Sequence, residues 1–215
     1  MCWNEETSWI TLTIGLIAVV VAFVYAPSLQ VKAVALIWGF VLLMQYFDAI
    51  AWRKKGKSKF AATGAMIANV LQPIVVGLVL LSITRASSFN QSTSVLIMVC
   101  YIAYILYALR GQSYDTLVPA NGCSHLRYKW WEDMSANTST HAGMIYLVVL
   151  IALIFLLLQP TAFAGMQVAY IIITLIISSV IYTCGAASIW CWFAAFAPIL
   201  TIAMWNYSVK GSVSG

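Results

Sequence analysis

The chain alternates long apolar stretches with short polar connections. Seven stretches are apolar along nearly their whole length and lack the every-second-residue polarity of a membrane β-strand. Backbone amides in lipid can be satisfied only within their own segment, so such runs predict transmembrane helices. The helices we expect are 9–26, 31–52, 60–83, 94–109, 142–158, 165–182 and 186–205. The fourth and fifth are short for a hydrocarbon core about 30 Å thick, so six or eight crossings remain alternatives to seven.

Composition supports the same fold class. Of 215 residues, 63% are apolar and 8% are charged, whereas a soluble domain carries about a quarter charged residues. Seven spans of about 20 residues occupy nearly the whole chain. We therefore predict an all-α protein in which residues 1–215 form one polytopic seven-helix transmembrane domain, integral to a membrane and multi-pass. No basic segment precedes the first apolar run, so it is expected to be a retained helix and not a signal peptide.

Basic residues are unevenly divided between the two faces of this topology. Eight fall on the face of the 53–59 connection and the long 110–141 loop, and three on the other. The eight are Arg53, Lys54, Lys55, Lys57, Lys59, Arg110, Arg127 and Lys129, and the three are Lys32, Arg85 and Lys210. The positive-inside rule then places the N-terminus and the long loop in the cytoplasm and the C-terminus outside. The glycosylation sequons at Asn90 and Asn206 fall on the outer face. The net charge of +5 thus reflects topology, and no nucleic-acid partner is expected.

One carboxylate, Asp48, lies inside a predicted span. An ionisable group there costs about 2 to 3 kcal/mol and usually has a partner. Gln45 lies one turn earlier, and the next helix brings Asn69 and Gln72, followed by a proline that frees a backbone carbonyl. The residues predict a polar patch in the cytoplasmic half of the bundle. Two interpretations stay open: interhelical glue, with Asp48 held by Arg53 or reaching the rim, or a binding or permeation site.

Aromatic residues mark two further places. Trp190 and Trp192 open the last helix and point to opposite sides, so at most one lines an internal cavity; we take Trp190 as the candidate. The 110–141 loop is the one connection long enough to carry structure of its own. It is expected either to fold against the helix ends, with Trp130 and Trp131 at the headgroup level, or to be a solvated linker.

Thiols and imidazoles gather on the predicted cytoplasmic face. Thiolate with imidazole suits zinc or copper, although no CxxC or HExxH spacing is present. The candidate ligands are Cys2, Cys123, His125, His141, Cys184 and Cys191. The alternatives are free cysteines that pack as small apolar residues, with no disulfides in a reducing compartment, or lipidation near the termini.

Several activities are excluded by missing residues. A retinal protein needs a lysine within a helix, and all seven lysines lie in loops or at helix ends, so no retinal is expected. No GxSxG nucleophile elbow, phosphate-binding glycine loop or regularly spaced helical arginines occur. These absences argue against a hydrolase, a nucleotide-binding protein and a voltage sensor.

Short motifs spread over the chain resemble those of a known family. They are Met1-Cys2-Trp3, residues 45–52, Gln72-Pro73, His125-Leu126 and Trp190-Cys191-Trp192. Together they are similar to seven-helix membrane proteins of microbes, algae and large DNA viruses that begin Met-Cys-(Trp or Phe)-Ser. The chain differs in having Asn4 for serine, Gln45 where glutamate is common, and Ala68 where histidine often precedes Gln-Pro. These differences weaken the case for a metal or proton role of the patch that rests on the resemblance. The resemblance implies a fold and a location, not a reaction.

Three functions follow as expectations. The first is a small-solute or ion transporter or channel that uses Gln45, Asp48, Asn69, Gln72 and Trp190. The second is a membrane-embedded metal or redox enzyme that uses the cysteines and histidines. The third is a non-catalytic structural or sensory protein. The expected partners are the lipid bilayer and a small molecule or ion, and self-association is left open.

Overall fold

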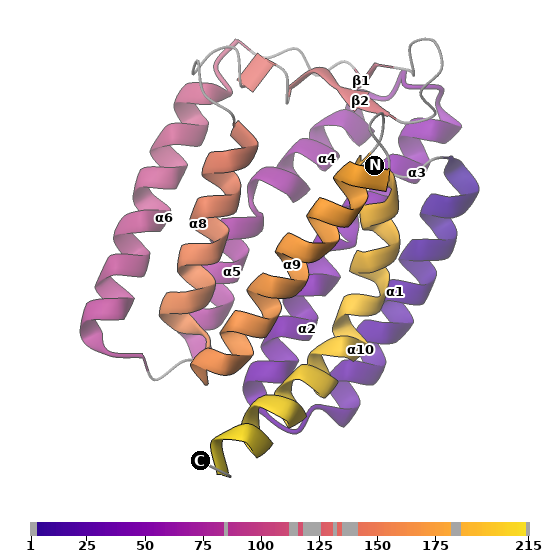
Figure 1. Cartoon of the computed structure of the whole chain (residues 1–215). Coiled ribbons are helices and arrows are strands. Elements are labelled where there is room, and N and C mark those ends of the chain that lie inside the picture. Colours follow the sequence, from indigo (N-terminus) through magenta and orange to yellow (C-terminus); the bar gives the residue numbers. More distant parts are fainter. Residues whose placement is uncertain are drawn as a thin grey trace.

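The computed structural model describes residues 4–83, 86–111, 116–117, 126–130, 133–134, 142–181 and 186–213. Almost all of them are helical (Figure 1). The helices are α1 (Glu5–Tyr25), α2 (Leu29–Val41), α3 (Leu43–Arg53), α4 (Lys59–Val70), α5 (Gln72–Ile83), α6 (Ser88–Ala108), α8 (Ala142–Leu157), α9 (Thr161–Ile181) and α10 (Ala186–Val213). Two short strands, β1 (Thr116–Leu117) and β2 (Arg127–Tyr128), pair antiparallel over one end of the bundle.

The lengths of the described helices fit an integral membrane protein. Five stretches are long and apolar enough to cross a bilayer: α1, α2 with α3, α6, most of α9 and most of α10. A sixth is added if α4 and α5, which meet at a bend of 48°, form one span. The remaining apolar helix is α8, with 16 residues. The helical class is confirmed, whereas seven crossings and the orientation of the termini stay predictions.

Helix starts differ most from the predicted bounds where polar residues cap the helix. The first helix begins at Glu5 and not at residue 9, because the Asn4 side chain accepts a hydrogen bond of 2.7 Å from Thr7 N. The fourth begins at Ser88 and not at 94, with Ser87 as the cap. It therefore has 21 residues and is not short. Asn90 in its first turn donates to the Leu156 carbonyl at 3.1 Å. Glycosylation would break this bond, so the sequon does not support the sidedness.

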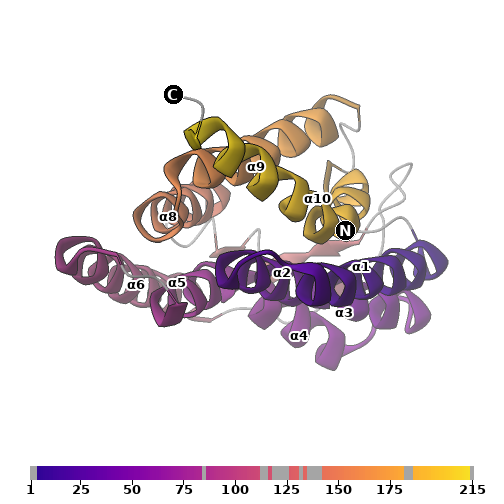
Figure 2. The same cartoon turned by 90° about the horizontal axis from the view of Figure 1, so that it is seen from below.

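The helices form a layered bundle. Viewed along the bundle in Figure 2, α8, α9 and α10 lie on one side, α6, α5, α2 and α1 form a row, and α3 and α4 lie beyond that row. Two apolar clusters fill the interior. The larger joins the row to α8, α9 and α10 through residues such as Leu42, Leu80 and Leu153. The smaller lies at the end covered by the strands, and four loop residues take part in it: Leu126, Tyr128, Trp130 and Met134.

The described part of the 110–141 loop is therefore folded and is not a solvated linker. Trp130 is 0% exposed within the smaller cluster. The expectation that the loop folds against the helix ends is confirmed for Trp130, whose ring packs in this cluster and lies 5.9 Å from that of Tyr128 between ring centroids. Its position at the headgroup level stays a prediction. Trp131 lies outside the described residues. The loop thus closes the end of the bundle above α3 and α4.

Candidate functional site

Two successive predicted helices change their hydrogen-bonding pattern near their middles. The 31–52 helix is α2 and α3, which form one continuous span with Leu42 in a right-handed helical conformation between them, whereas the 60–83 helix is α4 and α5, which meet at Leu71 with a bend of 48°. Pro73 accounts for the bend, because it has no N–H to donate to the carbonyl one turn earlier. Irregular backbone at membrane depth is tolerated where protein surrounds it or where it lines a water-filled cavity. Leu42 and Leu71 are therefore the natural places to look for a site.

Four predicted site residues lie near Leu42 and Leu71. Gln45 and Asp48 lie one and two turns after Leu42, on α3, while Asn69 and Gln72 lie on either side of Leu71. The side chains of Gln45, Asp48 and Gln72 are buried, and that of Asn69 is half-buried. All four polar side chains are therefore at least partly buried, and Gln45, Asp48 and Gln72 each hydrogen-bond to a different neighbour.

Asp48 is held by the loop. Its side chain is 1% exposed, and Oδ1 accepts a hydrogen bond of 2.8 Å from the hydroxyl of Tyr128 on β2. Burial above all, then the charge of Asp48 and this bond, raise the pKa of Tyr128 well above its ordinary value. The phenol keeps its proton at neutral pH and remains a donor. Asp48 is thus covered from the loop end by a buried tyrosine.

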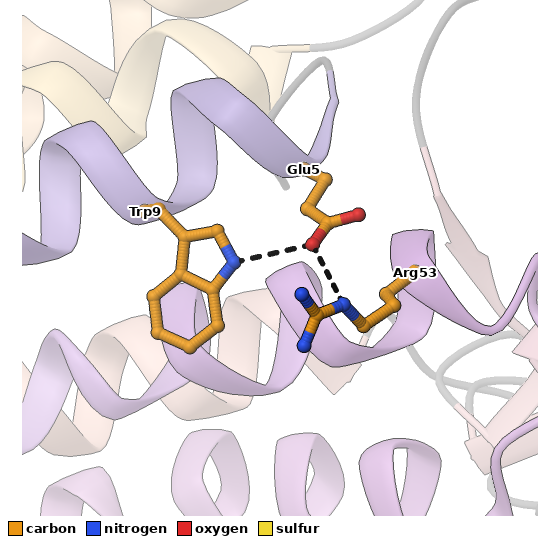
Figure 3. A network of polar contacts seen from close by, with 3 residues as sticks. All are labelled: Glu5, Trp9 and Arg53. Carbon is orange, nitrogen blue, oxygen red and sulfur yellow. Dashed lines mark hydrogen bonds and ion pairs between the residues drawn. The ribbon is translucent and has the colours of Figure 1, made fainter.

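The expectation that Arg53 holds Asp48 is replaced by a different ion pair. Arg53 Nε lies 3.1 Å from Glu5 Oε1, and the same oxygen accepts from Trp9 Nε1 at 3.4 Å (Figure 3). Both charged side chains are well exposed, so the pair contributes little to stability. It does show that the start of α1 and the end of α3 lie at the same end of the bundle.

The side chain of Gln45 forms a hydrogen bond with the last helix, α10. Its Nε2 donates to the backbone carbonyl of Cys191 at 2.9 Å. Its Oε1 is buried and accepts no hydrogen bond within the described part of the chain. One half of this amide thus links α3 to α10, while the other half presents an acceptor without a donor.

Near Leu71, too, some polar groups are hydrogen-bonded to neighbouring helices and one amide oxygen is not. Gln72 Oε1 accepts from the Tyr146 hydroxyl on α8, and the Tyr101 hydroxyl donates to the Val70 carbonyl at 3.2 Å. Asn69 Oδ1, directly before Val70 in sequence, is buried and has no donor among the residues described. Two amide oxygens, one near Leu42 and one near Leu71, are therefore left with unused acceptor capacity.

A second polar group, around Gln167 on α9, was not predicted. Gln167 Oε1 accepts from Trp38 Nε1 at 3.5 Å, and its Nε2 contacts Thr201 Oγ1 at 3.3 Å and Met204 Sδ at 3.2 Å. The signal was a lone amide inside an apolar span. Trp190 belongs to this second group, since its ring lies 6.2 Å from that of Trp38. Trp190 does face the bundle interior, but its described partner is this indole.

Most of the proposed metal ligands fall outside the described residues: Cys2, Cys123, His125, His141 and Cys184. Cys191 is buried and disulfide-bonded. Its partner lies outside the described residues, because Cys100, the other cysteine within them, is free. The expectation of reduced thiols is therefore wrong for Cys191, and a disulfide sulfur is not a thiolate ligand. The described residues contain no group of three or more His, Cys, Asp or Glu side chains placed to hold a metal.

No protein-family model, curated protein or solved structure matches this chain. The resemblance to the Met-Cys-(Trp or Phe)-Ser proteins stays a prediction. Function must be inferred from the site itself.

Proposed function

We propose that this chain is a membrane transport protein or channel that binds a small cation near Leu42 and Leu71. One observation carries the proposal: the buried amide oxygens Gln45 Oε1 and Asn69 Oδ1 have no donor among the described residues. Asn69 adjoins the 48° bend at Leu71, and Gln45 lies one turn after Leu42. A cation would occupy such oxygens, with the Asp48 carboxylate as the nearby negative charge.

The energetics favour an occupant. A buried acceptor without a donor costs about 1 to 3 kcal/mol, so two of them are an expensive arrangement for packing alone. Amide and carboxylate oxygens are ligands that hard cations prefer. Interrupted helices near the middle of the bilayer are where transporters build their ion sites. The three features support the same type of ligand.

Neighbouring residues hold the site in place. Tyr128 covers Asp48, the Cys191 carbonyl anchors Gln45, and Tyr146 anchors Gln72. In this scheme Asp48 carries the charge or the proton, and the amides complete the coordination. Access from the loop end requires Tyr128 to move.

The test is cation flux in reconstituted vesicles. Asp48→Asn should abolish pH-dependent uptake, because the neutral amide cannot balance a cation or carry a proton. Glu6→Gln removes an exposed carboxylate at the same end and should leave uptake unchanged. Thermal unfolding of each variant checks folding.

Two results contradict the proposal: no flux of any small cation with the parent protein, or equal flux in Asp48→Asn. Either result would assign the polar residues a structural role. In that role, their hydrogen bonds to α10, α8 and β2 hold the parts of the bundle together.

A further inference from the structure

The turn between α3 and α4 carries the densest charge in the described chain. Lys54, Lys55, Lys57 and Lys59 are all exposed. Arg53 beside them is paired with Glu5, whereas the four lysines make no ion pair within the described residues. Four uncompensated ammonium groups are therefore held within six consecutive positions.

The backbone of this turn is fixed by hydrogen bonds. Gly56 N donates to the Ala51 carbonyl at 2.8 Å, and Lys55 N donates to the Trp52 carbonyl at 2.9 Å. This pair of bonds is the Schellman motif that ends many helices. The lysines thus project from a rigid frame and not from a loose connection.

Lys55 occupies the position where this motif ordinarily has glycine. Its φ is 49°, in the left-handed region, and Gly56 follows at 76°. A side chain with a Cβ is disfavoured in this conformation, and glycine is not. Strained backbone at a non-glycine residue is a reason to look for function, and here the function would be to supply a charge at this point of the turn.

The surroundings of the turn suit a lipid. Two apolar helices end and begin here, so the turn lies where a spanning pair of helices leaves the bilayer. Phe60, directly after Lys59, is 64% exposed. The Ser58-capped start of α4 adds backbone N–H groups that favour a phosphate.

We propose that residues 54–59 bind the headgroup of an acidic phospholipid. The lysines and the start of α4 contact its phosphate, and Phe60 lies against its acyl chains. Clusters of four or more basic residues beside a transmembrane helix bind anionic lipids in this way. A free phosphate would share the ionic contacts but gain nothing from Phe60.

The experiment counts lipids retained by the purified full chain, by native mass spectrometry during titration with phosphatidylglycerol or phosphatidylcholine. The parent protein should prefer phosphatidylglycerol. A triple variant should bind phosphatidylglycerol more weakly, by about fivefold per lysine, equivalent to about 1 kcal/mol each. It combines Lys54→Gln, Lys57→Gln and Lys59→Gln. Lys32→Gln is the matched control, because Lys32 lies at the opposite end of the bundle over the Phe23 ring. Equal retention by the triple variant, or equal loss in the control, overturns the proposal.

Lys55 is tested by two variants. Lys55→Gly should raise the midpoint of thermal unfolding by about 2 to 4 °C while lowering phosphatidylglycerol affinity about fivefold. Lys55→Asn keeps a side chain that tolerates the left-handed region and should lose the same affinity. Unchanged phosphatidylglycerol affinity in both variants would show that Lys55 does not take part in the site. Phosphatidylglycerol should raise the midpoint of thermal unfolding of the parent protein, and inorganic phosphate alone should not. An equal rise with phosphate would show that the lipid assignment is wrong.

Discussion

Two buried polar regions of this bundle satisfy their hydrogen bonds to different extents. Around Gln167, both ends of the amide are occupied, and the hydroxyls of Thr174, Ser178 and Thr201 donate to carbonyls within their own helices. Near Leu42 and Leu71, Gln45 and Asn69 each retain a buried oxygen without a donor in the described chain. A buried amide alone therefore does not indicate a ligand site. Unused acceptors distinguish the region beside Leu42 and Leu71 from the region around Gln167, although Gln30 Oε1, at the start of α2, is also buried without a donor among the described residues.

The largest expected effect comes from removing one unused acceptor. Asn69→Leu should leave the cation-free protein as stable as the parent or slightly more stable, because a buried oxygen without a donor is lost. It should also eliminate both cation flux and the rise in unfolding temperature that added cation produces. Flux assays and thermal scans with and without cation measure this. A variant that loses stability but keeps flux would show that Asn69 is structural.

Removing the Tyr128 hydroxyl, which donates a hydrogen bond to Asp48, should have the next largest effect, a loss of stability. Tyr128→Phe removes the donor to a buried carboxylate, and a hydrogen bond to a charged group contributes about 1.5 to 3 kcal/mol. Chemical denaturation should show a loss of about 2 kcal/mol. Tyr107→Phe, at an exposed tyrosine, should change stability little. Equal behaviour of the two variants would contradict the assigned bond.

Alkaline pH should disturb the same contact. The pKa of Tyr128 is raised by burial in the folded protein above its ordinary value of 10.0, so the folded state holds this proton more tightly than the unfolded state. The resulting stability is fully present below pH 10 and is lost as pH rises toward the folded pKa, at up to about 1.4 kcal/mol per pH unit. Unfolding free energies measured from pH 9 to 11 should fall more steeply in the parent than in Tyr128→Phe. Parallel slopes would exclude this linkage.

The smallest effect is expected at the satisfied region. Gln167→Leu should reduce stability by about 1 kcal/mol, the scale of interhelical side-chain hydrogen bonds in membranes, and leave cation flux intact. Combined flux and unfolding measurements test this. Loss of flux with unchanged stability would reverse the assignment of the two regions.

Which end of the bundle faces the cytoplasm is a prediction, and two observations disagree about it. The basic residues place the loop end in the cytoplasm, while the disulfide at Cys191 is typical of an oxidising compartment. Counting basic residues loop by loop takes no account of cysteine pairing. Labelling of tags on the two chain ends by membrane-impermeant reagents decides between them.

The candidate site was predictable in part. The burial of Gln45, Asp48 and Gln72 was predictable, because polar side chains inside apolar runs are few and costly. Their partners were not, since Tyr128 lies 80 residues from Asp48 and Cys191 lies 146 from Gln45. Gln167 was overlooked because it stands alone in its span, with no second polar residue close by in sequence to mark it.

The sequence by itself determined that this chain forms apolar helices and where most of them lie, because helical hydrogen bonds are local and apolar length is read directly from the residues. Only the tertiary structure decided which polar atoms are satisfied and that the described part of the long loop covers Asp48. Those outcomes depend on which helices pack together, and packing brings together residues whose separation along the chain carries no signal of their contact.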